Sequence, residues 1–178
     1  DINNLFSLII KDSIPNNYSV PIDLMLKDDY CEKYFGLSLT IFAPSLAIAT
    51  VYMDDRQTGN GNFIADPGET FQLVCHLINK GDVAVTGDIV VNADNTDILI
   101  SPHAPVTINP KDTVTVNIDI EQPVEIPIGE EIQFEIIFLA EPYEVSQNMS
   151  LKIGGVTESF EKGDFNSFPW VNDILYPW

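Results

Sequence analysis

Three observations predict that this 178-residue sequence is an all-β protein. Ile, Val, Leu and Phe alternate with polar residues along most of the chain, which is the period of strands with one buried face. Turn clusters recur about every eight to twelve residues, a spacing typical of short consecutive strands. Twelve prolines and ten glycines punctuate the chain, and no helical periodicity is sustained. With 45% hydrophobic residues, the chain can bury a globular core.

The alternation defines the individual strands. The intervening clusters, such as residues 14–17, 79–82, 109–112 and 126–129, favour turns, because Pro fixes φ while Gly and Asn tolerate positive φ. We therefore expect strands at residues 5–10, 20–26, 37–42, 46–53, 70–78, 88–91, 113–120, 132–138 and 149–153.

An internal repeat organises these strands. Residues 8–41 align without gaps to residues 120–153, an offset of 112. The turn dipeptide Ile14-Pro15 falls on Ile126-Pro127. Apolar positions also coincide: Val20, Ile22, Leu24 and Leu26 fall on Ile132, Phe134, Ile136 and Phe138. A register held over so many positions indicates two copies of one β-module.

The repeat predicts three regions. Residues 1–43 are the C-terminal portion of a preceding module, residues 44–155 form one complete sandwich, and residues 156–178 are a linker or the start of a following module. A fragment of about three strands has an exposed apolar face and open edges. We therefore expect residues 1–43 to pack against the complete module or to pair with another chain.

The charge balance excludes some partners. The chain has 27 acidic against 8 basic residues, a formal net charge of −19. Nucleic acid is excluded because phosphate binding needs a basic face, and an anionic membrane surface is disfavoured for the same reason. No apolar run is long enough for a transmembrane segment. An acidic surface attracts divalent cations, although it also suits simple solvation.

The cysteines and histidines do not predict catalysis. Cys75 belongs to an alternating apolar set and reads as a small core residue, whereas Cys31 lies in a polar turn. The sequence does not decide whether Cys31 and Cys75 form a disulfide. His76 directly follows Cys75 on a strand, so their side chains point to opposite faces and cannot act as a nucleophile–base pair. His103 is a lone loop histidine, so we expect no catalytic residue.

Residues 54–69, the acidic loop, lie between two expected strands and offer many oxygen ligands. Calcium takes six to eight hard oxygens from carboxylates, amides and carbonyls. The order of an EF-hand is absent, and strands flank the segment rather than helices. The spacing therefore leaves a calcium loop and a plain acidic turn both open. The oxygen-bearing side chains are Asp54, Asp55, Asn60, Asn62, Asp66 and Glu69.

The acidic loop resembles that of a known family. The run from Asp55 through Gly59-Asn60-Gly61-Asn62 and Asp66-Pro67-Gly68-Glu69 to Asn79-Lys80-Gly81 is similar to D…GNGDG…DPGE…N.G in immunoglobulin-like β-sandwich modules of large secreted bacterial proteins. Such modules follow the catalytic domain of gingipain-like cysteine peptidases. Residues 158–170 likewise resemble the E-x-F-E-x-G-D-F…W opening of the jelly-roll module that often follows.

This resemblance implies an immunoglobulin-like antiparallel β-sandwich, non-catalytic and secreted or cell-surface. It also implies a structural Ca²⁺ site. Asn62 stands where the family has Asp, and Phe63 stands where Gly is usual. The residues carried over as metal ligands are Asp55, Asn60, Asn62, Asp66 and Glu69.

We therefore predict a spacer module that adjoins neighbouring domains of the same parent protein and is stiffened by calcium. One alternative is an adhesion module that binds a glycan or a protein at the cell surface. Trp170, Tyr176 and Trp178 could form a sugar-stacking platform, or belong to the core of a neighbouring module. A second alternative is an enzyme, which would need a pocket with convergent titratable groups.

Overall fold

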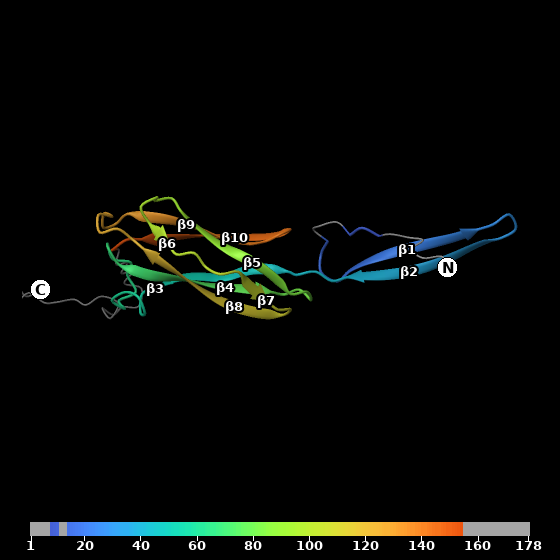
Figure 1. The fold of residues 1–178 in the computed structure, drawn as a ribbon, viewed down its shortest axis with the longest axis horizontal. Helices are drawn as coiled ribbons and strands as arrows, with labels where there is room; N and C mark the ends of the chain where they lie inside the picture. The colour runs from blue at the N-terminus through green and yellow to red at the C-terminus, as the bar shows by residue number, and fades with distance from the viewer. Residues whose placement is uncertain (1–7, 11–13, 155–178) are drawn as a thin grey trace, which may run out of the picture.

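The computed structural model describes residues 8–10 and 14–154, and every regular element within them is a β-strand (Figure 1). The prediction of an all-β protein is therefore confirmed. The strands are β1 (Tyr18–Lys27), β2 (Glu32–Ile41), β3 (Leu46–Asp54), β4 (Thr70–Asn79), β5 (Val85–Ala93), β6 (Leu99–Ile100), β7 (Val106–Ile108), β8 (Asp112–Glu121), β9 (Glu131–Ala140) and β10 (Tyr143–Lys152).

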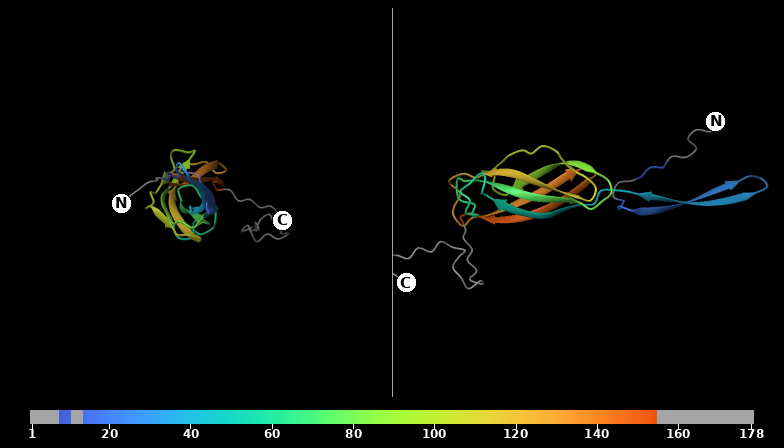
Figure 2. Two further views of the ribbon diagram at one scale, coloured as in Figure 1. Left: turned by 90° about the vertical axis from the view of Figure 1, so that its right-hand side faces the viewer. Right: turned by 90° about the horizontal axis from the view of Figure 1, so that it is seen from below.

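Strands β3 to β10 form an immunoglobulin-like β-sandwich. One sheet has the order β3-β4-β8-β6 and the other β10-β9-β5-β7, with antiparallel neighbours throughout. These orders match the arrangement of immunoglobulin sheets, in which the first two strands of the chain pair in one sheet and the last two in the other. Figure 2 shows the two sheets face to face.

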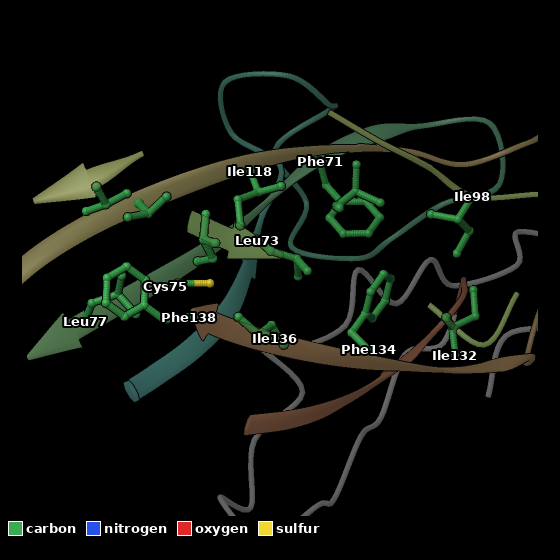
Figure 3. Close-up of a cluster of buried hydrophobic side chains, with 14 of the residues drawn as sticks. Phe71, Leu73, Cys75, Leu77, Ile98, Ile118, Ile132, Phe134, Ile136 and Phe138 are labelled. Carbon is green, nitrogen blue, oxygen red and sulfur yellow. The ribbon is translucent and has the colours of Figure 1, made fainter. Parts of the chain in front are cut away.

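The core lies between the two sheets and follows the sequence alternation. Phe71 and Leu73 project from β4 toward Phe134 and Ile136 on β9, and all four side chains are at most 1% exposed (Figure 3). Burying a side chain of this size contributes about 1.5–3 kcal/mol each. Cys75 lies in the same layer and is fully buried, which confirms its prediction as a core residue.

Strands β1 and β2 form a separate two-stranded sheet that extends from one end of the sandwich (Figures 1 and 2). The expectation that this region packs against the complete module is wrong for the described residues, which meet the module only at the base of the hairpin. The reason is that each sheet of the sandwich already covers the inner face of the other. Pairing of the hairpin with another chain stays a prediction.

The register of the hairpin reproduces the repeat. Val20 pairs with Leu39 in β1–β2, and Ile132 pairs with Leu151 in β9–β10. Adding 112 to each member of the first pair gives the second. The β1–β2 hairpin is therefore a copy of β9–β10 in strand pairing. The domain boundaries at residues 43 and 155 stay predictions.

Some strands differ from those expected. Strands β6 and β7 were not expected, because they are short; β6 precedes Pro102, and β7 lies between Pro105 and Pro110. Strand β10 begins at Tyr143, six residues earlier than expected, because an edge strand tolerates polar residues on its exposed face. Residues 8–10 carry no strand, and the rest of the strand expected at 5–10 lies outside the described residues, as does the motif at 158–170.

Candidate functional site

The acidic loop joins β3 to β4 at the end of the sandwich opposite the hairpin (Figure 1). Its far side contacts the end of the last strand: Ala65 forms a parallel bridge with Ile153, and the Gly154 N–H donates to the Ala65 carbonyl at 2.8 Å. The loop therefore holds the chain where it leaves the module.

Asp55 anchors the first half of the loop. Its side chain is fully buried, and its carboxylate accepts hydrogen bonds from the backbone N–H groups of Asn62 at 2.9 Å and Phe63 at 3.1 Å. Phe63 has φ 61°, a left-handed conformation that is uncommon for a bulky residue. The hydrogen bonds to a charged acceptor hold Phe63 in that conformation.

Glu69 anchors the second half. Its two carboxylate oxygens accept the backbone N–H groups of Asn60 at 2.6 Å and Asp66 at 3.1 Å. A Cβ atom on Gly59 would lie 2.3 Å from Glu69 Oε1 and would displace it from the Asn60 amide. This contact explains why Gly precedes Asn60 in the motif.

Asn60, Asn62 and Asp66 complete the network. The Nδ2 groups of both asparagines donate to Asp66 Oδ2 at 2.9 Å. Each asparagine Oδ1 accepts a backbone N–H two residues further on, which is the Asx-turn geometry. The structure thus brings all five residues predicted as metal ligands into one hydrogen-bonded cluster.

The cluster does not present an open set of carboxylates. Both oxygens of Asp55 and of Glu69 face N–H donors. Within residues 8–10 and 14–154, no group of three or more His, Cys, Asp and Glu side chains is arranged to hold a metal ion. The assignment of these residues as calcium ligands stays a prediction.

Sequence reasoning missed Gln122, which follows β8 and carries no local signal. Its side chain is 2% exposed, and its Nε2 donates to the Asp66 carbonyl at 2.5 Å. Its Oε1 is buried without a hydrogen-bond partner among the described residues. Gln122 therefore places one unsatisfied acceptor oxygen beside the acidic loop.

Asp54 differs from the other acids of the loop. Arg56 donates to its carboxylate through the side chain at 2.9 Å and through the backbone N–H at 3.0 Å. These hydrogen bonds, the side-chain one foremost, lower the pKa of Asp54 to about 2. The Arg56 guanidinium also lies 5.4 Å from the centroid of the Phe63 ring. Asp54 therefore forms an ion pair and is not among the clustered ligands.

The opposite end of the module has its own polar junction, built on the Asn79-Lys80-Gly81 motif. Asn79 is fully buried; its Oδ1 accepts the N–H groups of Ser45 at 3.0 Å and Gly81 at 2.9 Å, and its Nδ2 donates to the Val83 carbonyl. A Cβ on Gly81 would lie 2.2 Å from the Ala43 carbonyl oxygen. Only glycine therefore lets the chain pass so closely.

Asp82 connects this junction to the hairpin. Its Oδ2 accepts the Nδ2 groups of Asn16 at 2.6 Å and Asn17 at 2.9 Å, and its Oδ1 lies 3.1 Å from Lys111 Nζ. These contacts, the hydrogen bond from Asn16 foremost, lower the pKa of Asp82. The base of the hairpin is therefore fixed to the module by a charged acceptor.

The cysteines and histidines lie apart from any reactive arrangement. Cys31 and Cys75 are both free, and burial raises the pKa of the Cys75 thiol to about 11, which disfavours a nucleophilic thiolate. His76 stacks on Tyr52 with 5.9 Å between ring centroids, on the opposite face from Cys75. The exposed His103 has its Nδ1 2.6 Å from the Ala104 carbonyl oxygen.

One open hollow lies at the acidic-loop end and gathers three carboxylates, those of Asp97, Glu125 and Glu130. Its lining contains no His, Cys or Lys. Within the described residues, no helix has the length and apolar character needed to cross a bilayer.

No protein-family model and no curated protein matches the chain. Among solved structures, it is similar to a FixG-related protein from Vibrio parahaemolyticus (8% identity, TM-score 0.41, 48% of this chain and 80% of that one). It is also similar to Escherichia coli alpha-2-macroglobulin from domain MG7 to the C-terminus (15% identity, TM-score 0.41, 64% of this chain and 16% of that one). A third similar structure is PapD-like domain 7 of human CEP192 (13% identity, TM-score 0.36, 63% of this chain and 89% of that one). Similarities this distant assign no function.

Proposed function

We propose that this chain is a non-catalytic spacer module of a secreted or cell-surface multidomain protein, adjoining a peptidase domain of the gingipain-like kind. One observation carries the spacer role: both ends of the sandwich hold the adjoining chain through buried or charged polar groups. At one end, Asp82 holds Asn16, which precedes β1, and Asn79 holds Ser45, which leads into β3. At the other, the loop anchored by Asp55 holds Gly154.

A spacer must transmit direction as well as distance. A free linker would let the next domain rotate, whereas hydrogen bonds to a charged acceptor fix orientation. The secreted location and the peptidase neighbour rest on the sequence resemblance alone.

The experiment is to measure how the hairpin and the module tumble, by ¹⁵N relaxation on the intact chain. We expect β1–β2 amides to share the rotational correlation time of β4 and β8. In Asp82→Ala, which removes the acceptor for Asn16 and Asn17, the hairpin should tumble faster while the module is unchanged. The matched control is Asp88→Ala, an exposed acid on β5. A hairpin that already tumbles independently in the unmodified chain would refute the spacer role.

We further propose that the acidic loop takes up calcium. The buried, unpartnered Oε1 of Gln122 beside Asp66 supports this, as does the excess of carboxylate over cationic groups in the loop. The residues that would hold the ion are Asp55, Asn60, Asn62, Asp66 and Glu69. Carboxylate oxygens that accept hydrogen bonds retain lone pairs, so the donor set suits a hard cation.

Thermal melts with calcium and with excess chelator test this second proposal. An ion that binds only the folded state stabilises it by mass action and so raises the melting temperature. At an ion concentration one hundred times the dissociation constant, the free energy of unfolding rises by about 2.7 kcal/mol. Asp66→Ala and Glu69→Ala should abolish the shift, and Asp88→Ala should retain it. Equal melting temperatures with calcium and with chelator would leave the loop as a hydrogen-bonded turn, and would not affect the spacer proposal.

A further inference from the structure

In the part of the chain that the structure describes, both strands of the β1–β2 hairpin have an open edge, and one apolar face of the hairpin is uncovered. Within the described residues, β1 pairs with β2 and with no other strand. Leu26 is 59% exposed and Leu37 is 54% exposed. Apolar side chains in this amount on a paired hairpin are unusual for a free surface and mark a site of interaction.

The repeat identifies what covers the equivalent surface in the complete module. Strand β9, the counterpart of β1, pairs with β10 on one edge and with β5 on the other. In that second pairing Ile89 stands opposite Phe138, and Val91 opposite Ile136. The inner side chains of β9 are covered by β4 and β8 and are at most 3% exposed.

We propose that the open edge of β1 binds a strand equivalent to β5, carried by a half-sandwich of the same repeat that also covers the apolar face of the hairpin. Subtracting 112 from the β5–β9 register places the counterpart of Ile89 opposite Leu26, and that of Val91 opposite Leu24. The partner strand therefore runs antiparallel to β1 with alternate apolar residues. The sheet behind it presents an apolar face like that of β4 and β8.

A second copy of this chain does not supply that strand. In the folded module, β5 is already paired on both edges, with β9 and with β7. Pairing of two hairpins edge to edge would extend the sheet but leave the face that contains Leu24 and Leu26 uncovered. The occupant is therefore a half-sandwich without its own β9–β10 hairpin.

The test supplies such a half-sandwich to the chain. Because Leu8 aligns with Ile120, residues 44–119 fused directly ahead of Leu8 provide the strands β3 to β7 and β8 up to Asp119 in the expected register, with Leu8 and Ile9 at the last two positions of β8. We expect hydrogen exchange of the β1 amides that face the open edge to slow on the order of 100-fold relative to the natural chain, as amides enter a cooperative unit. Unchanged β1 exchange in a folded fusion would overturn the proposal.

Two neighbouring substitutions distinguish docking from general stabilisation. Leu24 is on the face that corresponds to buried Ile136, whereas Met25 is on the opposite face and is 54% exposed. In the fusion, Leu24→Asp should abolish the protection of β1 and Met25→Asp should retain it. Equal effects of both substitutions would count against a specific interface.

A second measurement decides the matter if the fusion does not fold. A synthetic peptide of residues 84–94, which contains β5, is added to the intact chain. Amide chemical shifts should change along β1 and not along β10, and Leu24→Asp should remove the changes. Absence of any change along β1 overturns the proposal. A dimer of the intact chain in sedimentation that Leu24→Asp dissociates also overturns it, because a second copy would then be the occupant.

Discussion

The hairpins β1–β2 and β9–β10 share one register and one alternation but differ in the burial of their apolar side chains. Phe134 and Phe138 on β9 are at most 1% exposed, whereas Leu26 on β1 is more than half exposed. Alternation and turn chemistry are thus sufficient for two strands to pair. Burial is a property of the whole sandwich, since a hairpin has no second layer to pack against.

The largest expected difference between the two regions is in the reactivity of the cysteines. Cys31 lies at the exposed hairpin tip, and Cys75 is in the core with its pKa raised to about 11 by burial. Cys75 should react only when the module opens, so a thiol reagent at neutral pH should label Cys31 on the order of 1,000-fold faster. Mass spectrometry after timed quenching measures both rates, and comparable rates would mean that the core is open.

The second largest effect compares equivalent core positions. Phe134→Ala removes a fully buried aromatic ring and should destabilise the module by about 3–5 kcal/mol. Ile22→Ala, at the equivalent position of the hairpin, should leave the unfolding free energy of the module unchanged, because Ile22 contacts no part of that core. Denaturant unfolding followed by far-UV circular dichroism measures the free energy of unfolding of both variants. A loss of more than about 1 kcal/mol for Ile22→Ala would show that the hairpin and the module unfold together.

The same contrast explains what could be predicted from the sequence. Core residues such as Leu73 and Cys75 follow from period-two alternation, and the hairpin register follows from the repeat. The strands β6 and β7 could not be predicted, because two or three residues are too few to show a period. Gln122 could not be predicted either, since its contact with Asp66 joins residues far apart in the sequence. The motif located the acidic loop. It did not predict the network in which backbone N–H groups of the loop donate hydrogen bonds to its carboxylates.

A smaller effect tests the two ends of the module. Asp55→Ala leaves the N–H group of Phe63 without its acceptor and leaves the Asn62 N–H with Asn60 Oδ1 alone. The loss should be about 1–3 kcal/mol for the unsatisfied group. Asn79→Ala at the opposite end should cost a similar amount, because it removes the acceptor of Ser45 and Gly81. Calorimetry in chelator measures both, with Asp88→Ala as the exposed control. A loss confined to one end would indicate that the other is closed by water instead.

The smallest effect concerns the ion pair that flanks the acidic loop. The pKa of Asp54 is lowered from 3.8 to about 2, so its folded-state pKa lies below its unfolded value. Its contribution to stability is therefore present above about pH 4 and is lost as the pH falls through about 2. Arg56→Gln should return the Asp54 midpoint toward 3.8, measured by NMR titration of the side-chain carboxyl carbon. A midpoint near 2 in Arg56→Gln would assign the shift to the loop backbone and join Asp54 to the same network as Asp55.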